Sequence, residues 1–539
     1  MVVIIGQLIF TVIAGMYFYG ALKNQRNTRS AGTLESSRAM ERIQRMRKVK
    51  LTEPLAEKVR PKALGDIIGQ EEGIEALRAA LCGKNPQHVI IYGPPGIGKT
   101  AAARLMLEEA KNVKGSPFAK DAPFIEMDAT TIRFDERSIA DPLMGSVHDP
   151  IYQGAGAYGA AGVPQPKEGA VTKANGGILF IDEIGELHPM QMNKLLKVLE
   201  DRKVFLTSAY YNSDSKTIPK HVHDIFQNGL PADFRLVGAT TRSPEDIPPA
   251  LRSRCTEIFF DSLKKCHIKR IAENAAESVS MEFGSDAAER VTMFASSGRE
   301  AVNIMQTAAT VALLDERNKV LTDDIERVVK WGRYSPRIEF KVPEKGRPGC
   351  VNGLGVFGSG GTLLTIEAWA KKAENGKGRL KVTGIVEEEE IKNGSQTMKR
   401  SSTAKSSVQN VLTLLERDYG IDYSDYNIHL NFPGGIPVDG PSAGIAIFTA
   451  IYSAVTNKIP DPSLAMTGEI SICGRVLPVG GVPRKIEAAV EAGAKRVIIP
   501  KDNFQKSFEK MDIEIIAVEK AEEILNICFI EENKGILTA

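Results

Sequence analysis

Histidine, tryptophan and paired cysteine are all scarce in this chain, which has 7 His, 2 Trp and 6 Cys among its 539 residues. The cysteines, at positions 82, 255, 266, 350, 473 and 528, form no C-x-x-C pair and have no histidine at the spacing of zinc ligands. The pattern therefore implies neither a zinc site nor a disulfide framework, and we expect reduced thiols, as in the cytosol.

Charge of one sign is also lacking, because the net charge is only +2. Nine Lys/Arg and two Glu in residues 23–50 give that segment a charge of +7, which leaves −5 for the rest of the chain. A mildly acidic body argues against a general nucleic-acid binder, so we expect no specific nucleic acid as a partner.

With 42% hydrophobic residues, the chain is long enough for about three globular domains.

Long hydrophobic runs are absent except near the N-terminus, where residues 2–22 carry no charge. A helix of this length spans about 30 Å, so we predict a single transmembrane helix over residues 1–22. A signal peptide would need basic residues before the apolar core, whereas here they follow it; a buried core helix is the other alternative. The basic residues place the remainder of a single-pass protein in the cytoplasm. We expect a partly helical, basic juxtamembrane linker over residues 23–60, which either contacts anionic lipid or serves as a solvated spacer.

A glycine-rich loop follows the apolar run at residues 89–92 and ends in Lys-Thr. In this G-x-x-x-x-G-K-[ST] pattern, backbone N–H groups bind phosphates, the lysine reaches the terminal phosphates, and the threonine hydroxyl ligates Mg²⁺. We therefore predict that ATP and Mg²⁺ bind here; the alternative is a plain glycine turn between a strand and a helix. The nucleotide-binding residues are Gly93, Pro94, Pro95, Gly96, Ile97, Gly98, Lys99 and Thr100.

A second apolar run, residues 177–181, ends in Asp182 and Glu183, 83 residues after Lys99. Such a run is typical of a buried parallel strand, whose carboxyl end faces the nucleotide. Asp182 would hold Mg²⁺ through water, and Glu183 would polarise the attacking water. The alternative is an acidic pair that merely lies at the surface.

Together with the turn Ile68, Gly69 and Gln70, these motifs resemble the AAA+ ATPases. The resemblance implies an α/β P-loop core over residues 61–260, followed by a helical lid over residues 261–335. It also implies a γ-phosphate sensor, an arginine finger that acts on a neighbouring subunit, and a second sensor in the lid. These positions are Thr240 or Thr241, Arg254 or Arg252, and Arg299. The ordinary alternative for Arg254 and Arg252 is a solvated side chain, and for Arg299 a residue at the start of a helix. An arginine finger that acts on a neighbouring subunit implies a ring, which we expect to be a hexamer.

Residues 149–159, between the two nucleotide motifs, are rich in glycine and small residues. AAA+ unfoldases hold their substrate with an aromatic residue in a flexible pore loop, and by resemblance Tyr152 or Tyr158 fits this role. In the alternative interpretation, both tyrosines pack locally in a surface loop. The sequence does not distinguish the two.

The composition changes again in residues 336–539, where a turn-rich loop delivers Ser442 to the start of an apolar helix. A serine at this place is ordinarily a helix N-cap. The same geometry would put its hydroxyl beside free helix N–H groups, as an oxyanion hole requires. His429 is the only histidine in this part of the chain, so a Ser-His-Asp triad is excluded and a lysine remains as the base.

The run Pro441, Ser442, Ala443, Gly444, followed 43 residues later by Lys485, resembles the Lon family of ATP-dependent serine proteases. The resemblance covers residues 60–539, implies an α+β proteolytic domain over residues 336–539, and makes proteins the substrates. By resemblance Ser442 is the nucleophile, Lys485 its partner, and Thr467 the residue that orients the amine. The apolar N-terminus is most similar to the membrane-anchored B-type members. The alternative is a membrane-tethered AAA+ remodeller without proteolysis, and the roles of Asp439 and Glu469 stay open.

Lys485 must be neutral to accept the proton of Ser442, although a free lysine has a pKa of about 10.4. Lowering the pKa to near 7 disfavours the charged form by about 4 kcal/mol. The apolar residues around it on the same helix supply the desolvation that would do this. They are Val482, Ile486, Ala488 and Ala489.

Overall fold

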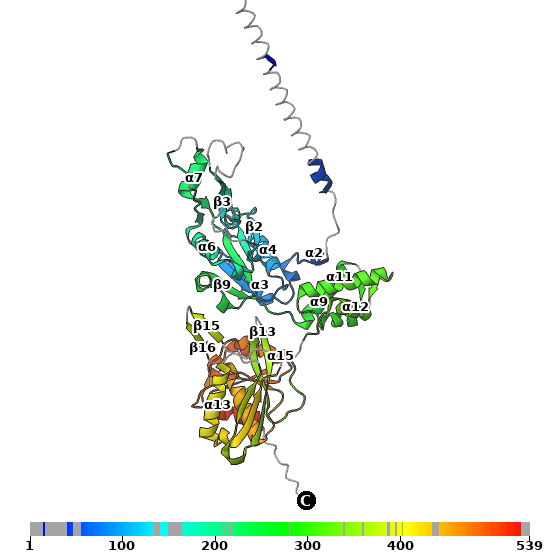
Figure 1. The fold of residues 1–539 in the computed structure, drawn as a ribbon. Helices are drawn as coiled ribbons and strands as arrows, with labels where there is room; N and C mark the ends of the chain where they lie inside the picture. The colour runs from blue at the N-terminus through cyan, green and yellow to red at the C-terminus, as the bar shows by residue number, and fades with distance from the viewer. Residues whose placement is uncertain are drawn as a thin grey trace, which may run out of the picture. The chain divides into compact units, whose positions relative to one another are not determined.

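The computed structural model divides the chain into two units, residues 1–58 and 59–539 (Figure 1). It describes residues 15–16, 40–46, 55–132, 141–148, 164–208, 211–214, 218–279, 281–337, 340–357, 360–384, 389–393, 396–400, 403–433 and 441–529. In the first unit, residues 40–46 form an exposed helix, and α2 (Leu55–Lys58) follows, so the linker is partly helical as predicted. Nearly all of the predicted membrane helix lies outside the described residues, and among those that are described no helix is long and apolar enough to cross a bilayer.

The core of residues 61–260 is a parallel sheet with strand order β2-β5-β8-β1-β9. Its central strands are continuous buried apolar runs, as expected for a sheet covered on both faces. The carboxyl ends of parallel strands lie at one edge, so the loops that follow them converge there. The strands are β1 (His88–Tyr92), β2 (Phe124–Asp128), β5 (Ile178–Asp182), β8 (Arg235–Thr240) and β9 (Cys255–Phe259).

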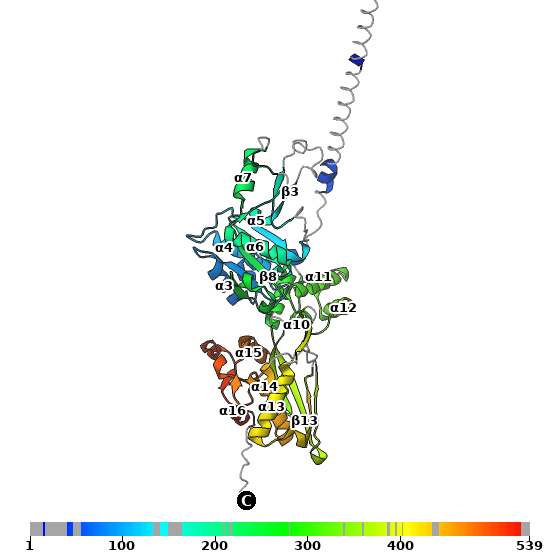
Figure 2. The same ribbon diagram turned by 60° about the vertical axis from the view of Figure 1, so that its left-hand side comes forward.

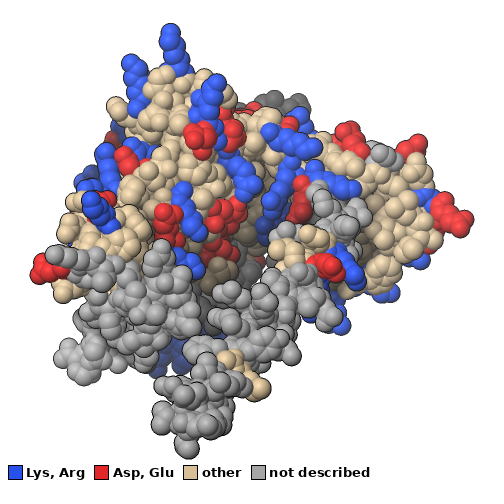
Figure 3. All heavy atoms as spheres, turned by 90° about the horizontal axis from the view of Figure 1, so that it is seen from above, with Lys and Arg blue, Asp and Glu red and all other residues tan. Residues whose placement is uncertain are grey.

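Helices and two short ribbons surround this sheet. The helices are α3 (Glu71–Leu81), α4 (Lys99–Ala110), α5 (Ala170–Lys173), α6 (Pro189–Asp201), α7 (Lys220–Asn228) and α8 (Pro249–Arg252). One ribbon pairs β3 (Gly145–His148) with β4 (Gln165–Glu168), and the other pairs β6 (Lys203–Val204) with β7 (Leu230–Pro231). Figure 3 shows Lys and Arg interspersed with Asp and Glu over the described part of one face.

The lid is helical, with α11 and α12 side by side in both ribbon views (Figure 2). Its long helix α11 begins after Ser297, whose side chain accepts a hydrogen bond from the Glu300 N–H and so caps the first turn. The lid elements are α9 (Lys265–Ser278), β10 (Glu282–Phe283), α10 (Ser285–Thr292), α11 (Gly298–Leu314), β11 (Lys319–Val320) and α12 (Thr322–Gly332).

The C-terminal part is built on a mixed seven-stranded sheet with order β14-β17-β13-β12-β18-β21-β22. Its strands are β12 (Cys350–Phe357), β13 (Gly360–Lys372), β14 (Leu380–Thr383), β17 (Tyr426–Asn431), β18 (Leu464–Met466), β21 (Arg496–Pro500) and β22 (Glu514–Val518). The ribbons are β15 (Glu389–Asn393) with β16 (Gln396–Arg400), and β19 (Glu469–Ile470) with β20 (Val476–Leu477). Its helices are α13 (Thr403–Tyr419), α14 (Gly444–Thr456), α15 (Val482–Glu491) and α16 (Ala521–Cys528). The structure thus has the predicted α/β core and helical lid, followed by a part that mixes helices with a seven-stranded sheet, as expected for the α+β class.

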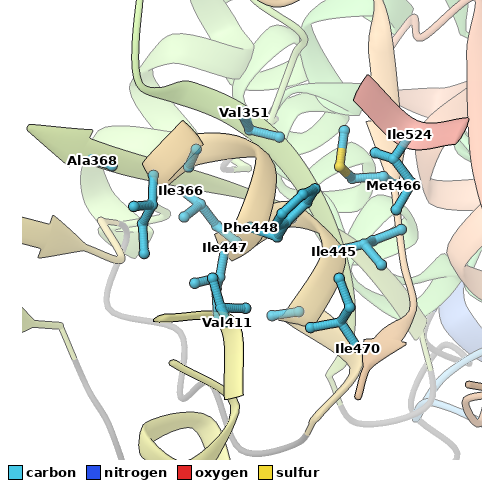
Figure 4. Close-up of a cluster of buried hydrophobic side chains, with 14 of the residues drawn as sticks. Val351, Ile366, Ala368, Val411, Ile445, Ile447, Phe448, Met466, Ile470 and Ile524 are labelled. Atoms are coloured by element: carbon cyan, nitrogen blue, oxygen red, sulfur yellow. The ribbon is translucent and has the colours of Figure 1, made fainter. Parts of the chain in front are cut away.

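Helix α14 is the centre of the C-terminal hydrophobic core (Figure 4). Ile445, Ile447 and Phe448 are fully buried against strands β12, β13 and β18 and helices α13 and α16. A helix that is apolar on every side can only be stable inside a domain. Its N-terminus, which follows Ser442, is therefore fixed by this hydrophobic core.

Candidate active sites

The phosphate loop lies between β1 and α4, and three of its glycines adopt positive φ angles: Gly93 at 154°, Gly96 at 73° and Gly98 at 98°. Residues with a Cβ rarely adopt these angles, which explains the glycines at these positions. Lys99 is only 6% exposed, and its Nζ donates to the carbonyl oxygens of Gly93 and Pro94 at 2.6 and 2.9 Å. The loop thus has the backbone shape and the cation that polyphosphate binding requires.

Asp182 and Glu183 end strand β5 at the same edge of the sheet. Burial is the main influence on Asp182 and raises its pKa, against the hydrogen bond that its Oδ1 accepts from the Glu183 N–H at 3.1 Å. Burial lowers the pKa of Lys99, and the charges of Glu183 and Asp182 oppose that lowering. The two carboxylates therefore lie close enough to Lys99 to act on it electrostatically. Asp182 and Thr100 offer the oxygen ligands that Mg²⁺ prefers; the described residues contain no cluster of three or more metal-ligating side chains.

The two threonines at the end of β8 have different surroundings. Thr240 is fully buried, and its Oγ1 accepts a hydrogen bond from the Arg242 N–H at 3.1 Å. Thr241 is exposed and donates both its N–H and its Oγ1 to Glu183 Oε2, each at 3.1 Å. Thr241 is thus the one in contact with the acidic pair, while Thr240 shapes the turn behind it.

The two candidate arginine fingers are both paired within the chain. Arg252 Nε donates to Glu257 Oε1 at 2.6 Å, and the same oxygen accepts from Tyr92 Oη at 2.9 Å. Arg254 contacts Glu200 and donates to the Ala250 carbonyl oxygen at 2.8 Å. Arg252 thus belongs to a network that includes a buried tyrosine of β1, whereas Arg254 is attached at the surface.

Arg299, the candidate second sensor, lies in the first turn of α11 beside the phosphate loop. A Cβ added at Gly96 would lie 3.2 Å from the Cβ of Arg299 and 3.2 Å from the side chain of Ser297. Gly96 therefore also allows the close approach of the lid. The pore-loop candidates Tyr152 and Tyr158 lie outside the described residues, as does Asp439.

Ser442 lies in the short 3-10 turn η9 (Pro441–Ala443) directly before α14. The helix N-cap is Ala443, which makes no side-chain cap bond, so Ser442 does not cap the helix as the plain structural interpretation expects. Its carbonyl oxygen is held instead by the Gly468 N–H at 2.9 Å and by Thr467 Oγ1 at 3.3 Å. The Ile445 N–H donates back to the Gly468 carbonyl at 3.1 Å. The nucleophile candidate is thus fixed from both sides by residues 467–468.

Lys485 lies in the first turn of α15 and is 3% exposed, with its Nζ donating to Thr467 Oγ1 at 3.1 Å. Burial lowers its pKa to about 8, in the direction that its apolar neighbours predict. Thr467 is fully buried and its N–H donates to the Ile498 carbonyl of β21 at 3.0 Å. One threonine hydroxyl therefore connects the lysine amine to the backbone of Ser442.

Gln70, in the turn that the sequence singles out, exchanges two hydrogen bonds with the backbone of Asp261, at 2.8 and 3.0 Å, which fix that turn. Three further polar residues that the structure brings to the two sites were not singled out by any sequence pattern. Arg242 and Glu186 form an ion pair beside Glu183. Ser407 of α13 is buried, with its Oγ 3.2 Å from where a Cβ at Gly444 would lie. The spacing of Glu186, one helical turn after Glu183, is the only local signal among these.

The comparisons with known proteins agree with this geometry. Residues 89–263 match the ATPase family associated with various cellular activities (AAA), and residues 319–531 match the Lon protease (S16) C-terminal proteolytic domain. Lon protease 2 of Bacillus subtilis is 58% identical over 523 residues, which cover 96% of this chain and 94% of the relative.

Archaeal relatives match at lower identity. The archaeal Lon protease of Methanothermobacter thermautotrophicus is 30% identical over 77% of this chain and 67% of the relative. That of Thermococcus kodakarensis is 31% identical over 76% and 66%. The chain thus belongs to the Lon protease family, with an AAA ATPase domain and a Lon proteolytic domain that together perform ATP-dependent protein degradation.

Proposed function

We propose that the chain cleaves peptide bonds with Ser442 as nucleophile, Lys485 as general base and Thr467 as the residue that orients the amine. The observation that carries this assignment is the hydrogen bond from Lys485 Nζ to Thr467 Oγ1, at 3.1 Å in a fully buried setting. A neutral amine that donates one N–H to Thr467 keeps its lone pair for the proton of Ser442. The turn that carries Ser442 is fixed by the same threonine, so base and nucleophile share one anchor.

In this mechanism, Lys485 accepts the Ser442 proton while Oγ attacks the substrate carbonyl. The ammonium then gives that proton to the leaving amine, which releases the first product and leaves an acyl-enzyme. Water, activated by the neutral amine, cleaves the ester and restores Ser442. N–H groups near the start of α14 would stabilise the negative charge on the carbonyl oxygen.

ATP hydrolysis uses the residues at the carboxyl edge of the parallel sheet. Lys99 and the loop N–H groups would bind the phosphates, and Thr100 and Asp182 would hold Mg²⁺, which would supply positive charge to the transferred phosphoryl group. Glu183 orients the attacking water, Thr241 or Thr240 senses the γ-phosphate, and Arg299 connects the lid to it. Arg254 is the better finger candidate, because it is attached at the surface to Glu200 and the Ala250 carbonyl, whereas Arg252 is bound to Glu257, which also accepts from the buried Tyr92.

We further propose a hexameric ring that is anchored in the membrane through residues 1–22, with residues from 23 onward in the cytoplasm, as in B-type Lon proteases. The uncharged run and the basic residues that follow it support the anchor. Arg254 supports the ring, because an arginine finger acts on the nucleotide of a neighbouring subunit. Flotation of the full chain with vesicles, and its mass in detergent with ATP, test these two points.

The central experiment is degradation of an unstructured protein by the detergent-solubilised full chain, with and without ATP and Mg²⁺. We expect cleavage that needs ATP and disappears in both Ser442→Ala and Lys99→Ala. A serine-reactive phosphonate should label the protein, and labelling should vanish in Lys485→Ala. Cleavage that survives in Ser442→Ala would overturn the assigned nucleophile.

A further inference from the structure

The turn after Asp182 has an unusual backbone. Glu183 has φ 48° and ψ 48°, in the left-handed region, and begins the 3-10 turn η5 (Ile184–Glu186). A residue with a Cβ adopts this conformation at an energetic cost, and it persists only where the surroundings hold it. Whatever holds η5 therefore determines where the Glu183 carboxylate points.

Two consecutive residues after β8 hold the two ends of this turn. Thr241 binds Glu183 at the first end, through the two 3.1 Å hydrogen bonds to Oε2. Arg242 binds Glu186 at the other end, where its Nε and one terminal nitrogen donate to Oε1 at 2.9 and 2.6 Å. The end of β8 thus contacts both carboxylates of the turn.

The middle of the turn fits the same strand end closely. A Cβ at Gly185 would lie 2.9 Å from Arg242 Cδ and 3.0 Å from Ile247 Cδ1, although the φ of Gly185 lies outside the left-handed range. Glycine at 185 therefore makes room for the arginine side chain rather than for an unusual backbone. Ile184 is fully buried over Gly238 of β8, where a Cβ would lie 2.8 Å from Ile184 Cδ1.

The arginine–glutamate pair is of little use to stability, because both side chains are 41% exposed and exposed pairs contribute little. Its effect is geometric. We propose that Glu186 and Arg242 are positioning residues for ATP hydrolysis, which fix η5 so that the Glu183 carboxylate, steered by Thr241, meets the attacking water. The inference rests on the proposed role of Glu183.

The test compares Arg242→Ala and Glu186→Gln with the wild type in the full chain. We expect kcat for ATP hydrolysis to fall about 10-fold in each, with KM for ATP and the affinity for a fluorescent nucleotide unchanged. The matched control is Arg78→Ala, which breaks a similar exposed pair with Glu109, 2.6 Å long, on α3 and α4. It should leave kcat unchanged, because that pair does not contact η5.

Two further variants exclude a merely structural role. Gly185→Ala keeps both charged groups but places a methyl group against Arg242; it should lower kcat in the wild type and have a smaller further effect in Arg242→Ala, where of these two contacts only that with Ile247 Cδ1 remains. In single-turnover measurements, adding Arg242→Ala to Glu183→Gln should not slow ATP hydrolysis further. Arg242 acts through the Glu183 carboxylate, which the glutamine has already removed.

Three outcomes would contradict the inference: an unchanged kcat in Arg242→Ala, a weaker affinity for nucleotide, or the same loss on top of Glu183→Gln. Failure of the underlying assignment is distinguishable, because Glu183→Gln would then hydrolyse ATP normally. If Glu183→Gln is inactive and Arg242→Ala is unaffected, only the positioning role is wrong.

Discussion

Two buried lysines lie in the two candidate active sites, and their surroundings differ in a way that suits the opposite roles that we propose for them. Lys99 and Lys485 are 6% and 3% exposed, and burial lowers the pKa of each. At Lys99 the carboxylates of Glu183 and Asp182 oppose that effect, which favours the ammonium form that phosphates attract. At Lys485 burial acts alone and lowers the pKa to about 8.

The role that we propose for each lysine follows from its neighbours rather than from its depth. Carboxylates at strand ends favour the charged form of Lys99, whereas burial favours the neutral form of Lys485, which the proposed base needs.

Lys485→Arg should abolish proteolysis, because arginine keeps a charge and cannot act as a base near neutral pH. We expect a loss of about 10³-fold or more in peptide cleavage, with ATP hydrolysis retained. Lys99→Ala should have the opposite pattern: ATP hydrolysis is lost, while cleavage of a short peptide that needs no unfolding is retained. Cleavage by Lys485→Arg above a few per cent of wild type would show that the amine is not the base.

Thr467→Val should lower kcat for peptide cleavage by about 10- to 100-fold, because the isosteric side chain loses its hydrogen bonds to both Lys485 and the Ser442 carbonyl. Thr467→Ser keeps the hydroxyl and serves as the matched control. Both variants should hydrolyse ATP at the wild-type rate. Equal losses in the two would mean that the methyl group, and therefore packing, matters more than the hydroxyl.

The sequence predicted the chemistry at each site better than the contacts that hold it. The phosphate loop, Asp182 and Glu183 follow from local patterns, since a strand must precede each and parallel strands end at one edge. The partner of Glu183 is 58 residues away in sequence, and Arg242 is 56 residues from Glu186. Such pairs depend on strand order and register, which periodicity does not give.

Ser442 illustrates the same limit at shorter range. Its place before an apolar helix was evident, but a shift of one residue decides whether it caps that helix or precedes the cap. The structure makes Ala443 the N-cap because residues 467–468 hold the Ser442 carbonyl. Thr467 is 25 residues from Ser442 in sequence, so no local pattern could have shown this contact.

The pH dependence of the two activities should sharpen the contrast between the lysines. The base must be neutral, and the neutral fraction of Lys485 falls as the pH drops below its pKa of about 8. Peptide cleavage should therefore rise with pH and level off above about 8, falling about 10-fold per unit well below it. A profile that is flat down to pH 6 would mean that Lys485 is neutral at far lower pH. The rate of ATP hydrolysis by Ser442→Ala should not show this rise near pH 8. That control separates the titration of Lys485 from an effect of pH on the ATPase domain or on assembly.

Each of the two domains also contains a buried hydroxyl that has no hydrogen-bond partner among the described residues. These are Thr172 Oγ1 of α5 and Ser407 Oγ of α13. A buried hydroxyl without a partner costs about 1–3 kcal/mol, so its removal should be neutral or stabilising. We expect Thr172→Val and Ser407→Ala to leave the melting temperature of their own domain unchanged, or to raise its free energy of unfolding by about 1 kcal/mol. Calorimetry measures both variants, and Thr449→Val, which removes a buried hydroxyl that does have a hydrogen bond, is the control. Destabilisation by Ser407→Ala would show that Ser407 has a partner in the folded protein.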